Sequence, residues 1–436
     1  MRNNELADHY RIPLIYNLFP RLAGTFDQWI GHARRARAMG FNWLYLNPIS
    51  YPGFSGSLYA VKDPYRLNPD FIPSSIVSDA LQSVEPVIRA IAALGLHPMI
   101  DLVVNHTAVD SPLLIQHPEW FQWEAYGAVR HPCAVDPVDP SKKTIWGDLA
   151  EVDNSHAPNR EALWAYWADV LKAYLLMGFE GIRCDAAYQV PVELWCYLME
   201  RAREINPRTV FFAENLGCTL EQMRALRHAG FHFFCNSSKW WDFREDWCLQ
   251  QQHEFADLAS ISFPETHDTP RLARETHGNE RIQRLRYGFA AVFSTGIMMP
   301  IGYEFGFQRN LHVVTTQPMD WETPTFDLCA FVAAVNELKR CLPILQGEGH
   351  IRAVVSPIEG LIILERRTLE APGEVGWIVI NTDPVHSRLC IPGDFIHQTS
   401  RLTLYRLAYA EQPSAVQEDI EKFTVAPSEI VLITGR

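Results

Sequence analysis

Short apolar runs alternate with amphipathic segments along the chain from about residue 12 to residue 345. Eight runs stand out, at residues 13–19, 41–48, 97–105, 181–187, 210–215, 231–236, 258–268 and 297–304. The intervening segments repeat apolar residues every three or four positions, which predicts helices at 28–40, 84–95, 162–178, 193–205 and 280–293. Glycines at helix ends suit left-handed C-caps, at Gly40, Gly95, Gly178 and Gly230.

This alternation predicts an α/β fold built on a parallel sheet. A doubly wound open sheet would alternate in the same way. However, there are eight strand–helix units and no GxGxxG motif at the first turn. Both features favour closure into a (β/α)8 TIM barrel.

The pattern changes after an amphipathic segment at 326–341, and short strand-like runs separated by Gly, Pro, Asn and Asp follow. We therefore expect two domains, a barrel at residues 1–345 and a C-terminal all-β sandwich domain at 346–436. Within the barrel, residues 109–145 form a short insertion after the third strand. Its aromatic and proline-rich sequence predicts an ordered loop over the barrel mouth.

Composition narrows the function classes. The chain has 436 residues, 38 basic and 51 acidic, a net charge of −13 and 47% hydrophobic residues, as in a soluble globular protein. This negative net charge disfavours nucleic acid or an anionic membrane as the main partner, because both are negatively charged. We expect no membrane span and no secretion signal. Nine scattered cysteines without a CxxC pair predict reduced thiols and a cytoplasmic location, while the oligomeric state stays open.

Candidate chemistry collects where the predicted strands end, because these ends form the active face of such a barrel. Polar side chains follow four of the eight strands, namely Asp101, Asn105 and His106 after the third, Arg183 and Asp185 after the fourth, Glu214 and Asn215 after the fifth, and His267 and Asp268 after the seventh. The sequence therefore predicts one rim that carries several carboxylates, one arginine and two histidines.

Such a rim supports glycoside chemistry, in which one carboxylate attacks the anomeric carbon and a second, with a raised pKa, protonates the leaving oxygen. Arg183 lies two residues before Asp185, so both side chains should point the same way, and the arginine should hold Asp185 ionised. Neutral histidines would donate to sugar hydroxyls. A zinc site at His106, His267 and Asp268 is the alternative, although these residues are not spaced as in an HxxxH or HExxH motif.

Four segments resemble, in order, the signature regions of the α-amylase superfamily, glycoside hydrolase family 13: DLVVNH (101–106), GIRCDAA (181–187), FFAEN (211–215) and PETHDTPR (264–271). The resemblance implies a retaining enzyme on α-1,4-glucan, maltooligosaccharide or maltosyl donors. It implies Asp185 as nucleophile, Glu214 as general acid/base and Asp268 as transition-state stabiliser. The expected substrate-binding residues are Tyr59, which follows Leu58 where the family has glycine, and Asp101, His106, Arg183, His267 and Tyr188.

A finer resemblance links IYNLFPR, QHPEWFQW and WGDLAEVDN to the branch of longer maltosyltransferases that extend glucan from maltose 1-phosphate. Tyr188 and Gln189 replace the Lys-His pair of most amylases, so the acceptor side should differ. Asn105 matches a calcium ligand of many amylases. The insertion that supplies the other ligands is short here, so we favour no calcium and expect no other cofactor.

Three alternatives stay open. The chain would be a maltosyltransferase with a sugar-phosphate donor, a non-catalytic carbohydrate-binding member of the family, or an enzyme that isomerises or transfers glucosyl units on sucrose or trehalose. We further expect transfer to a sugar to compete with hydrolysis. Four aromatic residues are predicted to line the acceptor side and exclude water, namely Trp146, Tyr188, Trp240 and Trp241.

Overall fold

The computed structural model describes residue 10 and residues 12–135, 141–356, 358–397, 402–407, 415–416 and 420–435. Eight parallel strands close into a barrel in chain order, each paired with its neighbours and the last with the first. They are β1 (Leu14–Leu18), β2 (Trp43–Leu46), β5 (His97–Leu102), β10 (Gly181–Cys184), β11 (Val210–Ala213), β12 (Phe233–Cys235), β13 (Ser260–Ser262) and β14 (Gly296–Pro300). The predicted (β/α)8 barrel is confirmed.

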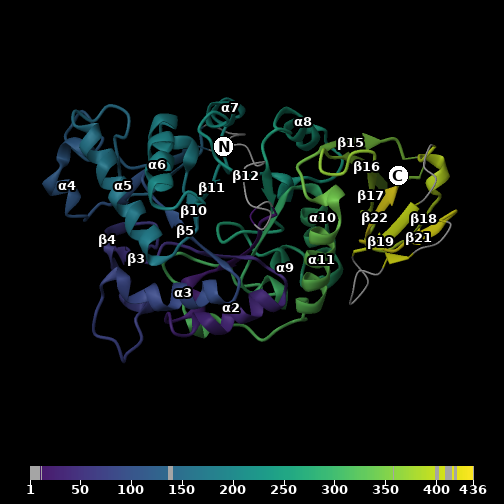
Figure 1. Ribbon diagram of the computed structural model, residues 1–436, viewed down its shortest axis with the longest axis horizontal. Helices are drawn as coiled ribbons and strands as arrows, with labels where there is room; N and C mark the ends of the chain where they lie inside the picture. Colours follow the sequence, from purple (N-terminus) through teal and green to yellow (C-terminus); the bar gives the residue numbers. More distant parts are fainter. Residues whose placement is uncertain are drawn as a thin grey trace.

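Helices surround this barrel (Figure 1). They are α1 (Pro20–Ala23), α2 (Trp29–Ala38), α3 (Glu85–Ala93), α4 (Leu113–Gln116), α5 (Arg160–Met177), α6 (Val192–Ile205), α7 (Leu220–Leu226), α8 (Trp247–Glu254), α9 (Leu272–Glu275), α10 (Glu280–Phe293) and α11 (Cys329–Cys341). Helix α5 ends at Gly178, whose φ of 104° is the left-handed cap expected from the sequence. Among the described residues, no helix is long and apolar enough to span a membrane.

Side-chain alternation divides the barrel into two cores. Inward positions of the strands form an apolar interior, which includes Ile15, Trp43, Tyr45, Met99, Val210, Phe212, Phe233, Ile261 and Met298. Most outward positions pack under the helices in a larger cluster. Near the carboxyl ends of the strands the inward positions become polar, and Asp101 on β5 lies opposite Arg183 on β10. The apolar interior therefore supports a polar layer at one end.

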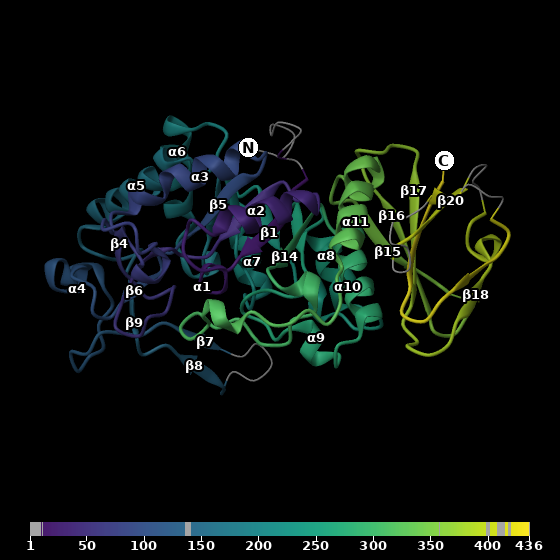
Figure 2. The same cartoon turned by 90° about the horizontal axis from the view of Figure 1, so that it is seen from below.

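The insertion after β5 is built from short antiparallel pairs. β6 (His106–Ala108) pairs with β9 (Leu149–Glu151), and β7 (Cys133–Val135) pairs with β8 (Lys143–Ile145). Figure 2 shows β7 and β8 lying along the same side of the barrel as α9, which follows the carboxyl end of β13. Residues 136–140 of the predicted insertion lie outside the described residues. A further pair, β3 (Ser50–Pro52) and β4 (Val61–Leu67), follows β2.

The C-terminal part is all-β, as the sequence predicts. β15 (His350–Val354), β16 (Leu361–Arg367), β17 (Val375–Asn381), β22 (Ile430–Gly435), β19 (Leu402–Arg406) and β20 (Ala415–Val416) form one antiparallel sheet, in that order. One face packs on the pair β18 (Arg388–Cys390) and β21 (Phe423–Val425). The other face contacts α10, which places the sheet beside the barrel (Figure 1). Whether residues 1–345 and 346–436 act as two domains stays a prediction.

Candidate active site

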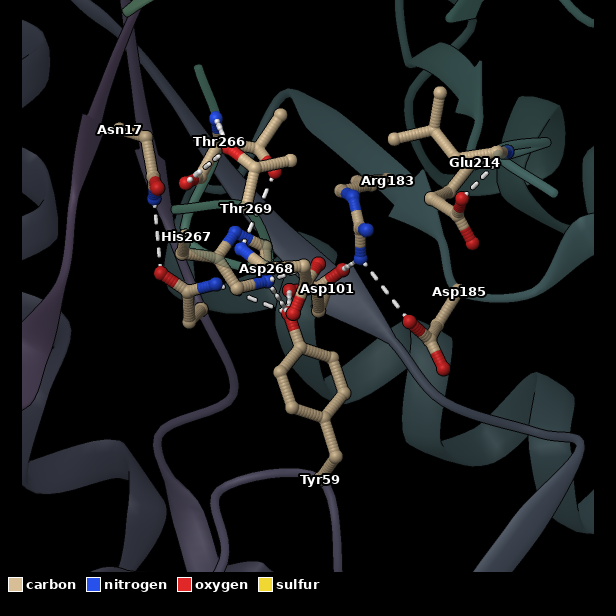
Figure 3. Close-up of polar contacts among 12 residues, drawn as sticks. Asn17, Tyr59, Asp101, Arg183, Asp185, Glu214, Thr266, His267, Asp268 and Thr269 are labelled. Atoms are coloured by element: carbon tan, nitrogen blue, oxygen red, sulfur yellow. Dashed lines mark hydrogen bonds and ion pairs between the residues drawn. The ribbon is translucent and has the colours of Figure 1, made fainter. Parts of the chain in front are cut away.

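Two acidic side chains leave neighbouring strands at the same level of the rim. The strand register pairs Cys184 with Ala213, so Asp185 and Glu214 follow directly on β10 and β11. The backbone N–H of Glu214 donates to the carbonyl oxygen of Cys184 at 3.0 Å. Because paired strands lie about 4.8 Å apart, both carboxyl groups face one small space. Figure 3 shows both of them on the same side of Arg183, to its right in the view.

The turn after β10 positions this pair. Ala186 has a φ of 42°, a left-handed conformation that costs free energy for any residue with a side chain. Its N–H donates to Glu214 Oε2 at 3.0 Å, and the N–H of Leu216 donates to Oε1 at 2.7 Å. Both oxygens of Glu214 are therefore held by backbone donors from two different loops, which orients the carboxyl group.

Arg183 lies buried between two carboxylates. Its Nη1 donates to Asp101 Oδ1 and, at 3.1 Å, to Asp185 Oδ1. The side chains of Arg183 and Asp185 thus point the same way, as their spacing predicts. Burial raises the pKa of Asp185 even though the arginine acts to lower it, so Arg183 does not by itself set the charge of Asp185.

Asp101 lies beneath the rim. Its carboxylate accepts hydrogen bonds from the hydroxyls of Tyr45 at 2.5 Å and Tyr59 at 2.9 Å, in addition to Arg183. Its side chain has no exposed surface, and burial raises its pKa. In the structure the Asp101 carboxylate positions Arg183 and Tyr59, and the predicted contact of Asp101 with substrate stays a prediction.

The loop after β13 brings His267 and Asp268 to the rim. The rings of Tyr59 and His267 stack with an interplanar angle of 3°, and His267 Nε2 lies 2.8 Å from the Tyr59 hydroxyl. The same nitrogen lies 3.0 Å from Asp268 Oδ2. Thr266 and Thr269 close the turn, since the N–H of Asp268 donates to Thr266 Oγ1 and that of Thr266 to Thr269 Oγ1 (Figure 3).

The two carboxyl groups Glu214 and Asp268 have opposite electrostatic surroundings. Burial, with the negative charges of Asp185 and Asp268, outweighs Arg183 and raises the pKa of Glu214 to about 7. For Asp268, burial acts to raise the pKa, but the charge and hydrogen bond of His267 prevail and the pKa is lowered. One group can hold a proton at neutral pH while the other stays ionised, a division found in acid–base sites.

His106 and Tyr188 complete the predicted set from two further loops. His106, the first residue of β6, is 6% exposed, and burial lowers its pKa to about 4, so the ring is neutral. Its Nε2 has no hydrogen-bond partner among the described residues. Tyr188 is half-buried and its hydroxyl accepts from Gln189 Nε2 at 3.4 Å, while Gln189 Oε1 accepts from Asn105 Nδ2 at 2.9 Å. These residues surround the carboxylates.

The zinc alternative is not supported by the described part of the chain, which contains no group of three or more His, Cys, Asp or Glu side chains arranged to hold a metal ion. His267 is next to Asp268, but His106 belongs to the insertion strand β6. The amide nitrogen of Asn105, which matches a calcium ligand of amylases, is bonded to Gln189.

Comparison with known proteins shows which enzymes this chain is similar to. A family model, the glucanotransferase domain of glycogen debranching enzyme, matches residues 13–130. The chain is 26% identical over 393 residues to the alpha-1,4-glucan:maltose-1-phosphate maltosyltransferase of Burkholderia pseudomallei, covering 87% of this chain and 34% of that protein. The Myxococcus xanthus enzyme of the same name is 24% identical, covering 85% and 59%. The chain is therefore similar to a glucanotransferase domain and to maltosyltransferases, which agrees with the resemblance of its four motifs.

Solved structures of an α-amylase and of an α-glucosyl transfer enzyme show the same fold over almost the whole chain. An α-amylase from Lactobacillus plantarum superimposes with a TM-score of 0.76 at 21% identity, covering 98% of this chain and 100% of the other. The α-glucosyl transfer enzyme XgtA gives a TM-score of 0.75 at 12% identity, covering 98% and 99%. The chain spans about a third to three-fifths of the length of the two maltosyltransferases, so their complete activity does not transfer directly.

Several site residues escaped the sequence reasoning. Tyr45 lies on β2 and Asn47 lies just after the strand, two residues later, so both side chains point to the same side. Both donate hydrogen bonds to the cluster around Tyr59 and Asp101. Their alternate spacing in the second apolar run was the signal that could have found them. The backbone donors of Ala186 and Leu216 carry no such signal, because any residue type has an N–H.

One predicted role is wrong. Trp241 is 2% exposed and packs on Phe243, Phe289 and Phe293 in the cluster between the barrel and the C-terminal sheet. It therefore cannot line an acceptor site. Trp240 is 51% exposed and Trp146 39% exposed, so both keep surface for a ligand.

Proposed function

We propose that this chain is a retaining enzyme that acts on α-1,4-glucan, maltooligosaccharides or maltosyl donors through a glycosyl–enzyme intermediate. The observation that carries the proposal is the pairing of Asp185 and Glu214 on adjacent strands, with a pKa of about 7 for Glu214. A nucleophilic carboxylate beside a carboxyl group that holds a proton at neutral pH is the arrangement that double displacement needs.

In the first step Asp185 attacks the anomeric carbon. Arg183 engages Oδ1 and leaves Oδ2 for the new C–O bond. Glu214 transfers its proton to the glycosidic oxygen, which departs with the bonding electron pair. Glu214 is then ionised, as its two backbone donors allow. The departing group leaves as an alcohol, and the sugar remains as an ester on Asp185.

In the second step Glu214 acts as base. It removes a proton from water or from a sugar hydroxyl, whose oxygen attacks the anomeric carbon and releases the Asp185 carboxylate. Two inversions restore the α configuration. Asp268, kept ionised by His267, would stabilise positive charge at the anomeric centre and accept from sugar hydroxyls. His106, through its unpartnered Nε2, and His267 would bind further hydroxyls, and the Tyr59 ring would stack on the sugar.

The likeness to two maltosyltransferases favours transfer to a sugar over hydrolysis. A glycosyl–enzyme partitions between water and any bound alcohol, and a bound acceptor gains a high effective concentration. A second candidate function is maltosyl transfer from a sugar-phosphate donor, which the same relatives favour. Loss of catalysis is disfavoured, because all three predicted carboxylates lie together at the rim.

Product analysis tests the proposal. Purified protein is incubated separately with glycogen, maltooligosaccharides and maltose 1-phosphate, with Asp185→Ala as the inactive control. We expect longer glucan chains with few new reducing ends, and α-anomers as the first products by proton NMR. The β-anomer appearing first would exclude double displacement. One new reducing end for every bond broken, without longer chains, would show a plain hydrolase.

A further inference from the structure

A cavity of about 80 Å³ lies on the other side of β11 and β12 from the candidate active site. Its floor is the outward face of β12 and β13, which presents Phe234, Asn236 and Ser260. Its walls are α7 and α8, which lie next to each other in both views of the molecule (Figures 1 and 2). Glu214 and Asn215 are consecutive, so alternation along the chain directs Glu214 to the barrel mouth and Asn215 to this cavity.

The walls are tied to each other. Arg224 Nε on α7 donates to Glu254 Oε1 on α8 at 2.5 Å, and Arg227 Nε, just after α7, donates to Asp257 Oδ2 at 3.0 Å. The exposed residues Thr219 and Leu220 stand at the edge of the cavity, so it opens to solvent. A fixed space with an open edge is accessible to a small molecule.

The floor is unusually polar for the outside of a barrel. At the corresponding outward positions of β10 and β11, Ile182 and Phe211 pack in the apolar core. On β12 and β13, by contrast, Asn236 Nδ2 donates to Ser260 Oγ at 2.9 Å and to Ser262 Oγ at 3.0 Å. These groups satisfy one another, so the floor presents a bonded polar surface to the cavity instead of an apolar one.

An unpartnered polar atom also faces the cavity. Asn215 is 8% exposed and lines the space, yet its Oδ1 has no hydrogen-bond partner among the described residues. Its Nδ2 contacts the sulfur of Met223 at 3.3 Å. A buried amide oxygen without a donor is costly, and a ligand hydroxyl would satisfy it.

The lining selects a ligand class. Beside the amides and hydroxyls, Phe234, Phe255 and Leu258 provide apolar lining. The described residues that line the cavity include no charged side chain, so nothing there pairs with a phosphate or a carboxylate. A pyranose has an apolar C–H face and a rim of hydroxyl groups. We propose that this cavity is a second sugar-binding site, which takes one ring of a neutral mono- or disaccharide.

The volume is consistent with one sugar ring. A space of roughly 10–15 Å³ holds one water molecule, so this cavity holds several waters or the small ring that displaces them. Binding here does not require turnover. A binding experiment therefore tests this site independently of the proposed function.

Hydrogen–deuterium exchange with peptide resolution tests the site on the full chain. D-glucose and D-maltose are titrated, and protection is followed in peptides from α7 and α8 and in peptides from residues 183–190 and 264–269 at the rim. We expect concentration-dependent protection of α7 and α8. Unchanged exchange there up to the solubility limit of both sugars overturns the proposal, whatever the rim peptides do. Stronger protection by glucose 1-phosphate than by glucose overturns the neutral-ligand assignment.

Matched variants localise the effect. Gln251 on α8 lines the cavity, whereas the adjacent Gln250 is exposed. Gln251→Leu should weaken binding about two- to tenfold, the value of one neutral hydrogen bond, and Gln250→Leu should not. Ser237→Ala, a smaller change at the same cavity, serves if Gln251→Leu melts early. Equal half-saturation in the cavity variants and in Gln250→Leu would show that the sugar binds elsewhere.

Discussion

Replacing Glu214 with glutamine should make the protein more stable in alkaline solution while it abolishes activity. The carboxyl group is 9% exposed and accepts from the N–H groups of Ala186 and Leu216. Burial and the neighbouring carboxylates raise its pKa from 4.5 to about 7. The folded protein therefore favours the protonated form, and a glutamine keeps the shape of that form without titrating.

The free energies follow from this pKa. A rise from 4.5 to about 7 corresponds to about 3 kcal/mol between the two protonation states. The protonated form of Glu214 therefore contributes this amount to the free energy of unfolding relative to the ionised form. The contribution is fully present below pH 4.5 and is lost as the pH rises through about 7. Glutamine has one acceptor oxygen for two backbone donors, which costs about 1 kcal/mol at every pH. The Glu214→Gln variant should be less stable by about 1 kcal/mol near pH 4 and more stable by about 2 kcal/mol near pH 8.

Urea unfolding at the two pH values measures the difference. The control is Glu204→Gln on α6, because that glutamate is 55% exposed and should show no such crossing. A Glu214→Gln effect of the same sign and size at both pH values would refute the raised pKa. Kinetics provide a second readout, since wild-type kcat/KM should fall about tenfold per pH unit above pH 7 as the acid loses its proton.

Other substitutions probe the surroundings of the site. Trp241→Ala should lower the free energy of unfolding by about 3–5 kcal/mol and leave the ratio of transfer to hydrolysis unchanged. A changed ratio would show that Trp241 does act on the acceptor side. Arg271→Met leaves the buried Glu265, 2.7 Å from the guanidinium, without its partner and should cost about 3–5 kcal/mol in urea unfolding. Thr269→Val loosens the turn that carries Asp268 and should lower kcat/KM about two- to tenfold, with Thr269→Ser near wild type.

Periodicity alone determined the architecture. Alternation of apolar runs with three-to-four-residue repeats predicts all eight barrel strands, because strands and helices bury side chains with different periods. The positions of Asp185, Glu214 and Asp268 also follow from the sequence, since each stands near the end of an apolar run and parallel strands all end at one face. The short strand-like runs predicted after residue 346 likewise form strands in the structure.

Only the tertiary structure decided how these side chains interact. Tyr45 donates to Asp101 across 56 positions of sequence, and Glu214 receives its second donor from Ala186, 28 positions away. The pKa of about 7 results from burial and from charges on other strands, which no local pattern encodes.

The aromatic residues make the limit clearest. Trp240 and Trp241 are neighbours in the sequence, yet one is half-exposed and the other is 2% exposed. The chain turns there out of a short helix, Ser238–Trp240, and directs Trp241 against Phe289 and Phe293 of α10. Local sequence identifies both as large apolar rings. Which of them remains available to a ligand depends on the C-terminal sheet, whose strands begin about a hundred residues later. Residues of that sheet share a buried cluster with Trp241, and this cluster forms only when the whole chain has folded.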